Sequence, residues 1–198
     1  SRLATDVFIR EVKRTWNASL DDDALRRMLV DAVELANRAV YEHAQLSEDF
    51  SGMGTTLVAA WISRDLAVII NVGDSRAYHI SKRANSIYQI TRDHSLVEEL
   101  VEAGAITKEQ ARLHPQKNVI TRALGSEAEV RPDYFEFTLQ PGDILLLCSD
   151  GLSNMVTDLE MLEYAKEYQD PELICRALMS KALIRGARDN VTVVAVMR

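Results

Sequence analysis

The sequence predicts an α+β fold, in which antiparallel strands pack against layers of helices. The spacing of apolar residues changes along the chain, from every third or fourth residue near the N-terminus to short β-branched or aromatic runs further on. Short polar breaks separate several of these runs, as expected for consecutive hairpins. Helices outside an antiparallel sheet form the α+β class. About six to eight strands are expected. That number is enough for two facing sheets, although the pattern alone does not require two.

Two helices are expected at the N-terminus. Apolar residues recur at helical spacing from Leu3 to Trp16, and again in a longer stripe that ends near Val40. The second stripe follows Ser19 and three aspartates at 21–23, which is typical of a helix start. We expect these two helices to form one layer that packs against a sheet.

Strands are expected next. Residues 54–62, 66–80 and 86–91 are rich in β-branched and aromatic residues, and hairpin-sized polar breaks separate them. Two short helices follow, divided at Ala103-Gly104, and the second begins at Thr107.

The C-terminal third alternates strands and helices in the same way. Residues 132–150 suggest two strands around a Pro-Gly turn, and residues 157–187 suggest a helical segment interrupted at Pro171. A last strand closes the chain after Asp189.

Composition restricts the function classes. The 198 residues carry a formal net charge of −7, so no basic face is available for nucleic acid. No apolar run reaches the length of a membrane span, and the N-terminus lacks the apolar core of a signal peptide. Only two cysteines, Cys148 and Cys175, occur, both in apolar surroundings. We therefore expect a cytoplasmic protein with buried thiols.

Three aspartates share one setting. Asp74, Asp150 and Asp189 each lie where an apolar strand meets a turn, next to glycine or asparagine. If they converge at one rim of a sheet, they repel each other unless a cation offsets the charge, and oxygen ligands suit Mg²⁺ or Mn²⁺. The alternative is that each is only a turn residue or a helix cap. No His/Cys cluster, nucleophile elbow or P-loop is present.

The motifs, in this order, resemble the bacterial metal-dependent Ser/Thr protein phosphatases of the PPM family, phosphatase 2C type. The resemblance covers almost all of residues 1–198 and rests on SGMGTTLVAA, NVGDSRAY, PGDILLLCSDGLSN and RDNVTVVAV. The connecting segment ITRDHSLVEELVEAGAITKEQARLHPQKNVITRALG makes the match specific.

The resemblance implies an antiparallel β-sandwich flanked by helix pairs, as one domain over residues 1–198. It implies that Asp150 and Asp189 bind the two metal ions, Mg²⁺ or Mn²⁺, and that Asp74 binds an additional ion together with Asp150. It also implies a flap at about 93–125 and hydrolysis of phosphoserine or phosphothreonine by a metal-activated water.

The N-terminus departs from the family pattern. The family's phosphate-binding arginine strand and its metal-bridging Asp-Gly turn have no counterpart, because Asp6 and residues 21–23 are expected to be helical. We therefore expect an N-terminally truncated domain that lacks the first metal-binding motif and has impaired activity. Exposed sheet edges would then favour an edge-paired or swapped dimer.

Two function classes stay open at this point. The first is a protein-serine/threonine phosphatase that acts on phosphorylated proteins, expected to be substrates of a bacterial Ser/Thr kinase. The second is a catalytically inactive phosphatase-like binding module. A purely structural α+β domain is a third and more distant reading. Retention of Asp74, Asp150 and Asp189 in their motifs favours the enzyme.

Overall fold

The computed structural model describes residues 1–50, 52–187 and 189–198. Contacts between residues divide the chain into two compact units, which are described separately. Unit 1 comprises Ser1–Leu57, Ile70–Gly73 and His94–Tyr134, and unit 2 comprises Val58–Ile69, Asp74–Asp93 and Phe135–Arg198.

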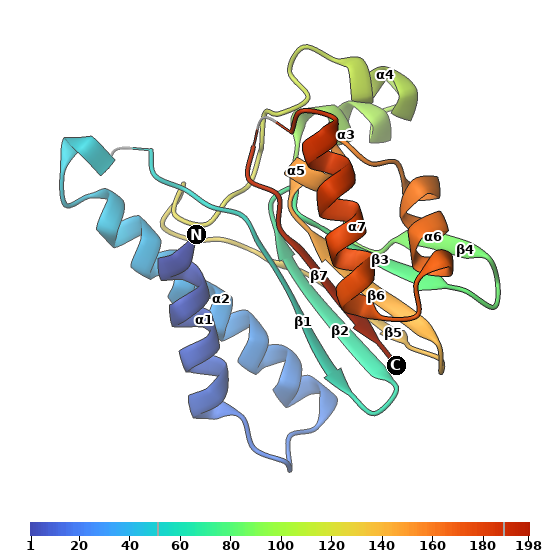
Figure 1. The fold of residues 1–198 in the computed structure, drawn as a ribbon. Helices are drawn as coiled ribbons and strands as arrows, with labels where there is room; N and C mark the ends of the chain where they lie inside the picture. Colours follow the sequence, from blue (N-terminus) through green and yellow to red (C-terminus); the bar gives the residue numbers. More distant parts are fainter. Residues whose placement is uncertain (51, 188) are drawn as a thin grey trace. The chain divides into compact units, whose positions relative to one another are not determined.

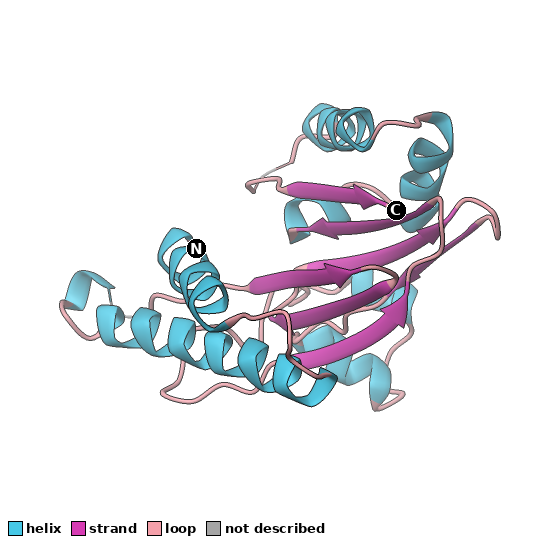
Figure 2. Cartoon of the chain, turned by 90° about the horizontal axis from the view of Figure 1, so that it is seen from below, coloured by secondary structure: helices cyan, strands magenta, loops and turns pink. Residues whose placement is uncertain are grey.

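The predicted N-terminal helices are present in unit 1. They are α1 (Arg2–Thr15) and α2 (Asp22–Ala44), which pack against each other along their apolar stripes (Figure 2). Asp21 caps α2, because its carboxylate accepts a hydrogen bond of 2.7 Å from the Ala24 backbone N–H. A short 3-10 helix, η1 (Glu48–Phe50), follows α2.

The strands form two sheets (Figure 1). The three-stranded sheet has the order β1-β2-β5, with β1 at Leu57–Ser63, β2 at Leu66–Val72 and β5 at Asp133–Thr138. The four-stranded sheet has the order β4-β3-β6-β7 and is antiparallel throughout. Its strands are β3 (Arg76–Ser81), β4 (Ser86–Gln89), β6 (Asp143–Cys148) and β7 (Val193–Met197).

Within unit 2 the two sheets face each other across a shared apolar core. Ala67 and Ile69 of β2 pack in one cluster with Ala77 of β3 and Leu145 of β6, and each is at most 1% exposed. Side chains that alternate along each strand supply this inner layer. The predicted β-sandwich is therefore confirmed.

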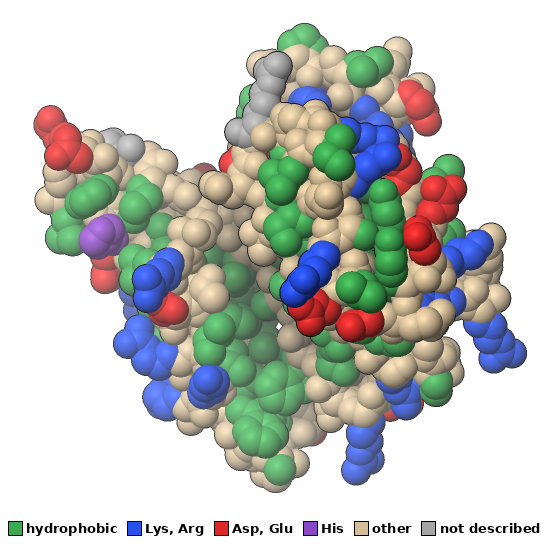
Figure 3. Space-filling model, viewed as in Figure 1, with side chains coloured by type: hydrophobic (Ala, Val, Ile, Leu, Met, Phe, Trp, Pro, Cys, Tyr) green, Lys and Arg blue, Asp and Glu red, His purple; other side chains and the backbone are tan. Residues whose placement is uncertain are grey.

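The other face of the four-stranded sheet is covered by α6 (Asp158–Glu167) and α7 (Pro171–Ile184). Tyr78 and Leu146 of the sheet are fully buried in one cluster with Met161 of α6 and Leu178 of α7. The helical segment is interrupted at Pro171 as expected: Asp170 caps α7, and Pro171 occupies its first turn. Apolar and charged side chains alternate over the outer surface of these two helices (Figure 3).

The expectation of one continuous strand over residues 66–80 is wrong. The segment forms β2 and β3, which belong to different sheets, and the break lies at Gly73. Gly73 has a φ of +109°, and a Cβ at this position would come within 2.3 Å of a Thr56 side-chain carbon. Only glycine fits this turn, which directly precedes Asp74.

Three further helices complete the fold. In unit 1, α3 (Leu96–Glu102) begins at its cap Ser95, and α4 (Lys108–Leu113) begins with a capping box between Thr107 and Gln110. In unit 2, the four-residue α5 (Asp150–Ser153) follows β6 directly. The sequence pattern did not predict α5.

The thiols differ in exposure. Cys148 is 2% exposed in the core of unit 2, whereas Cys175 is only half-buried, so the expectation of two buried thiols holds for the first alone. Within the described ranges, no helix combines the length and the apolar character needed to cross a bilayer.

Candidate functional site

The register of the four-stranded sheet brings the three predicted aspartates to one end. Arg76 of β3 pairs with Cys148 of β6, and Cys148 also pairs with Val193 of β7. Asp74 lies two residues before this level, Asp150 two residues after it and Asp189 four residues before it. Because neighbouring strands run antiparallel, all three positions lie beyond the same end of the sheet, where β3 and β7 begin and β6 ends.

These carboxylates influence one another electrostatically. Burial raises the pKa of Asp74 from 3.8 to about 6, and the charges of Asp150 and Asp93 add to this effect. Burial also raises the pKa of Asp150, and the neighbouring charge of Asp189 acts in the same direction. The cluster therefore holds more negative charge than its surroundings stabilise, which is the condition a bound cation relieves.

Hydrogen bonds of Ser149, referred to below as the Ser149 clip, join the segments that carry Asp150 and Asp189. The Ser149 hydroxyl donates to the Asn190 carbonyl at 3.0 Å and accepts from the Thr192 N–H at 3.0 Å. The Ser149 N–H also donates to the Thr192 carbonyl at 3.1 Å. A Cβ on Gly151 would come within 2.5 Å of the Asn190 carbonyl oxygen. The Ser-Asp-Gly sequence is thus fitted to the chain that follows Asp189.

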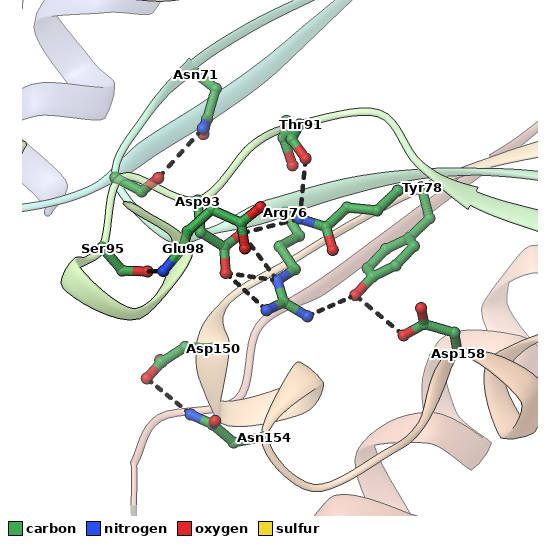
Figure 4. Close-up of polar contacts among 12 residues, drawn as sticks. Asn71, Arg76, Tyr78, Thr91, Asp93, Ser95, Glu98, Asp150, Asn154 and Asp158 are labelled. Atoms are coloured by element: carbon green, nitrogen blue, oxygen red, sulfur yellow. Dashed lines mark hydrogen bonds and ion pairs between the residues drawn. The ribbon is translucent and has the colours of Figure 1, made fainter. Parts of the chain in front are cut away.

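Arg76 and Asp93 form a partly buried ion pair in unit 2 (Figure 4). The Arg76 Nε donates to both carboxylate oxygens of Asp93 at 3.0 Å, and Nη2 donates to Oδ2 at 2.6 Å. The two side chains are only 24% and 10% exposed. This bidentate arrangement is the strongest geometry available to an arginine and a carboxylate.

Neighbouring side chains complete the pair. Arg76 Nη1 donates to the Tyr78 hydroxyl at 3.0 Å, and that hydroxyl lies 3.5 Å from an Asp158 carboxylate oxygen (Figure 4). The Gln89 amide donates to Asp93 Oδ1 at 2.9 Å. Burial disfavours the charge of Arg76, but Tyr78 and Asp93 raise its pKa above the ordinary range. The guanidinium therefore stays charged.

In unit 1, His94 fixes the backbone at Gly73. The Gly73 N–H donates to His94 Nδ1 at 3.0 Å, and the His94 N–H donates to the Gly73 carbonyl at 3.0 Å. The Nε2 atom lies 3.2 Å from an Asp133 carboxylate oxygen. Nδ1 therefore accepts a hydrogen bond from Gly73, whereas Nε2 contacts both Asp133 and the Arg122 guanidinium, whose Nη1 lies 2.9 Å away.

The donor set suits a hard divalent ion, although the acids are not arranged as a closed cage. Across residues 1–50, 52–187 and 189–198, no three His, Cys, Asp or Glu side chains converge closely enough to hold a metal ion by themselves. Burial and neighbouring carboxylates nevertheless raise the pKa of Asp74 and of Asp150 against the smaller opposing effect of Arg76, so a bound cation would favour their charged forms. Carboxylate oxygens are the ligands that Mg²⁺ and Mn²⁺ prefer.

Residues 1–183 match the family model described as protein phosphatase 2C. The chain belongs to the protein phosphatase 2C family. It is 40% identical to the serine/threonine phosphatase stp of Listeria welshimeri over 199 aligned positions. This alignment covers 99% of this chain and 78% of that protein. It is 35% identical to the protein phosphatase PhpP of Streptococcus pneumoniae, over 98% of this chain and 78% of that protein.

Solved structures agree with these relatives. The serine/threonine phosphatase Stp1 of Staphylococcus aureus superposes with a TM-score of 0.89 at 38% identity, over 98% of this phosphatase and 76% of that chain. The catalytic domain of the phosphatase PstP, in complex with two manganese ions, gives a TM-score of 0.83 at 33% identity, over 98% and 80% of the two chains. The predictions of a PPM-type fold and of a serine/threonine phosphatase are confirmed.

The sequence pattern did not identify the structural roles of Asp93 and His94. Asp93 lies between the strand expected at 86–91 and the short helices that follow; Ser95 is the helix cap there, and Asp93 pairs with Arg76. His94 is 5% exposed, and its Nδ1 accepts the hydrogen bond of the Gly73 N–H. The only available signal was the presence of these polar residues between apolar strands, and that signal does not name a partner.

Proposed function

We propose that Asp74, Asp150 and Asp189 are the metal ligands of this phosphatase. Their shared position at one sheet end and the electrostatic strain on Asp74 and Asp150 support the assignment. Asp150 would be common to the sites, because its charge interacts with both Asp74 and Asp189. The observation that carries the proposal is the sheet register that aligns the three turns.

The cofactor would be Mg²⁺ or Mn²⁺. Ions bound there would neutralise charge on a phosphoryl group and activate a water for in-line attack on phosphorus. Other residues of the chain would hold these ligands in place. The Ser149 clip fixes Asp150 beside the segment of Asp189. The turn at Gly73 fixes the backbone that directly precedes Asp74. None of the carboxylates is required as a nucleophile.

The substrates would be phosphoserine and phosphothreonine in proteins, which fits the names of the relatives. We also propose that residues 1–198 act as one phosphatase 2C-like domain in the cytoplasm and reverse the action of a bacterial Ser/Thr kinase. Residues 93–125, which include α3 and α4, would form the flap that influences the choice of substrate.

A dimer paired along β7 is proposed as the form of the isolated chain. β7 is the last strand of its sheet, and Val194 and Val196 are 47% and 40% exposed. Such an edge can pair with a second copy. Light scattering after size exclusion should give twice the chain mass, and Val194→Lys should return the monomer mass. A monomer in both samples would refute this part.

The assignment of the metal ligands is tested by Mn²⁺-dependent hydrolysis of a phosphothreonine peptide. The unmodified chain of residues 1–198 is compared with Asp150→Asn and Asp189→Asn, and each variant should lose activity by on the order of a hundredfold or more. Glu163→Gln, an exposed acid of α6, is the matched control and should retain activity. The same assay, run beside a relative from the family, tests whether the activity of residues 1–198 is impaired.

The outcomes separate the two function classes. Metal-dependent turnover that is lost in the aspartate variants supports the enzyme. Binding of phosphopeptide without turnover in any sample would favour the inactive binding module instead. Turnover that survives both substitutions would refute the assignment of Asp150 and Asp189.

A further inference from the structure

Arg76 is the cation that acts on both Asp74 and Asp150. Its charge lowers the pKa of each, against the larger opposing effect of burial. Arg76 begins β3, two residues after Asp74, and it is level with Cys148, two residues before Asp150. A guanidinium here is therefore a potential competitor for any cation that the acids bind.

The Asp93 carboxylate binds the guanidinium of Arg76. Three hydrogen bonds of 2.6–3.0 Å direct Nε and Nη2 of Arg76 to the Asp93 carboxylate, and Nη1 is directed to Tyr78. Nε, Nη1 and Nη2 of Arg76 thus all have partners other than Asp74 and Asp150, and Figure 4 shows them directed to Asp93 and Tyr78. Asp93 is held in turn by the Gln89 amide at 2.9 Å, so the carboxylate cannot swing away freely.

Loss of the Asp93 charge would release the guanidinium. A partly buried arginine without a counter-charge is costly, so its fork would turn to other carboxylates. Asp74 and Asp150 are candidates, because their charges already interact with Arg76. An ion pair formed there would satisfy the acids and reduce their affinity for a metal ion.

We propose that Asp93 is a positioning residue that withholds the Arg76 guanidinium from Asp74 and Asp150, and thereby preserves their affinity for a divalent cation. The inference rests on the proposed function of Asp74 and Asp150 as metal ligands. It assigns Asp93 no contact with metal or substrate. The negative charge of Asp93 serves to cancel one particular positive charge, and the acid-rich end of the sheet keeps its net charge.

The test is a double-mutant cycle read by Mn²⁺ binding, with calorimetry or the EPR signal of free Mn²⁺, on the full chain. Asp93→Asn keeps the shape of the side chain and removes its charge, and it should weaken the binding by on the order of tenfold or more. Adding Arg76→Met removes the released cation, so the double variant should return to within about threefold of the parent chain. Asp93→Glu, which can still pair with Arg76, should bind nearly as the parent does.

Asp158→Asn is the matched control. It removes one negative charge from the same network but not the carboxylate that holds the guanidinium, so Mn²⁺ affinity should stay within about twofold. Thermal unfolding of each variant checks the fold. If Asp93→Asn does not fold, Asp93→Glu and the double variant still test the proposal.

Each remaining outcome decides against the inference. Unchanged affinity in Asp93→Asn would show that the guanidinium does not compete. A double variant as weak as Asp93→Asn would assign the loss to the charge or the structure of Asp93 itself. If Asp74→Asn and Asp150→Asn bind Mn²⁺ as the parent does, or if the parent does not bind it, the proposed ligands fail as well. If those two variants lose binding and Asp93→Asn does not, only the present inference fails.

Discussion

Asp74 combines burial with negative neighbours, so its charge opposes folding of the metal-free chain. Its pKa rises from 3.8 to about 6, and burial is the larger cause. Since the folded pKa lies above the unfolded one, the stabilising contribution is complete below about pH 4 and is lost as the pH rises through about 6. A metal ion reverses this balance because it favours the charged carboxylate.

Asp74→Asn is therefore expected to stabilise the chain in chelator at neutral pH. A pKa raised from 3.8 to about 6 corresponds to about 3 kcal/mol of unfolding free energy, and partial exposure of the side chain reduces this to about 1–2 kcal/mol. The gain in unfolding free energy should appear at pH 8 and vanish near pH 4. Urea unfolding at both pH values measures it. An equal gain at both would contradict the titration argument.

His94 provides a second test at the residue scale. Two substitutions of His94 are compared. In His94→Asn, the Oδ1 atom can take the place of Nδ1 and accept the hydrogen bond of the Gly73 N–H. In His94→Gln, the side-chain amide reaches the position of Nε2 instead. His94→Gln leaves a buried N–H without its acceptor and should cost about 1–3 kcal/mol. His94→Asn should cost clearly less. Chemical denaturation of both variants decides, and equal losses would argue against a specific role of the Gly73 bond.

At the scale of elements, two short pieces of chain align the acids. The Gly73 turn sends β2 and β3 into different sheets, and the Ser149 clip joins the end of β6 to the segment before β7. The turn requires glycine because of its positive φ and the nearby Thr56. The clip requires a small residue at 151 because the Asn190 carbonyl approaches so closely.

Gly151→Ala is expected to separate the two segments. The added methyl would collide with the Asn190 backbone, so Asp189 must shift relative to Asp150. We expect phosphatase activity to fall by about tenfold or more, together with a loss of about 1–3 kcal/mol of stability. Gly142→Ala is the control, because nothing lies within 4 Å of its added methyl. It should lose stability, through its φ of +88°, with little effect on activity.

For the whole molecule, metal binding should appear as stability. An ion that binds only the folded state stabilises by about 2.7 kcal/mol at a concentration of 100 times its Kd. Mn²⁺ should therefore raise the melting temperature of the parent chain, and chelator should reverse the change. Asp150→Asn should show no such increase. A similar rise in Asp150→Asn would place the bound ion elsewhere.

The organisation of the molecule was largely predictable from periodicity. The helical stripes of α1 and α2, the start of α4 at Thr107 and the interruption at Pro171 all appear where the sequence suggested, since helix periodicity and helix starts are local. The break at Gly73 was missed because two strands joined by a tight glycine turn read as one apolar run. The four-residue α5 is too short to have a period.

The sequence by itself determined the class of fold, the family motifs and the three aspartates at strand ends. These follow from local spacing and from residue type. Only the tertiary structure decided that β3, β6 and β7 are neighbours, and hence that the three aspartates share one end of a sheet. It also decided that Asp93 pairs with Arg76 across 17 positions of sequence. Strand order and side-chain pairing depend on contacts between distant residues, which no local pattern encodes.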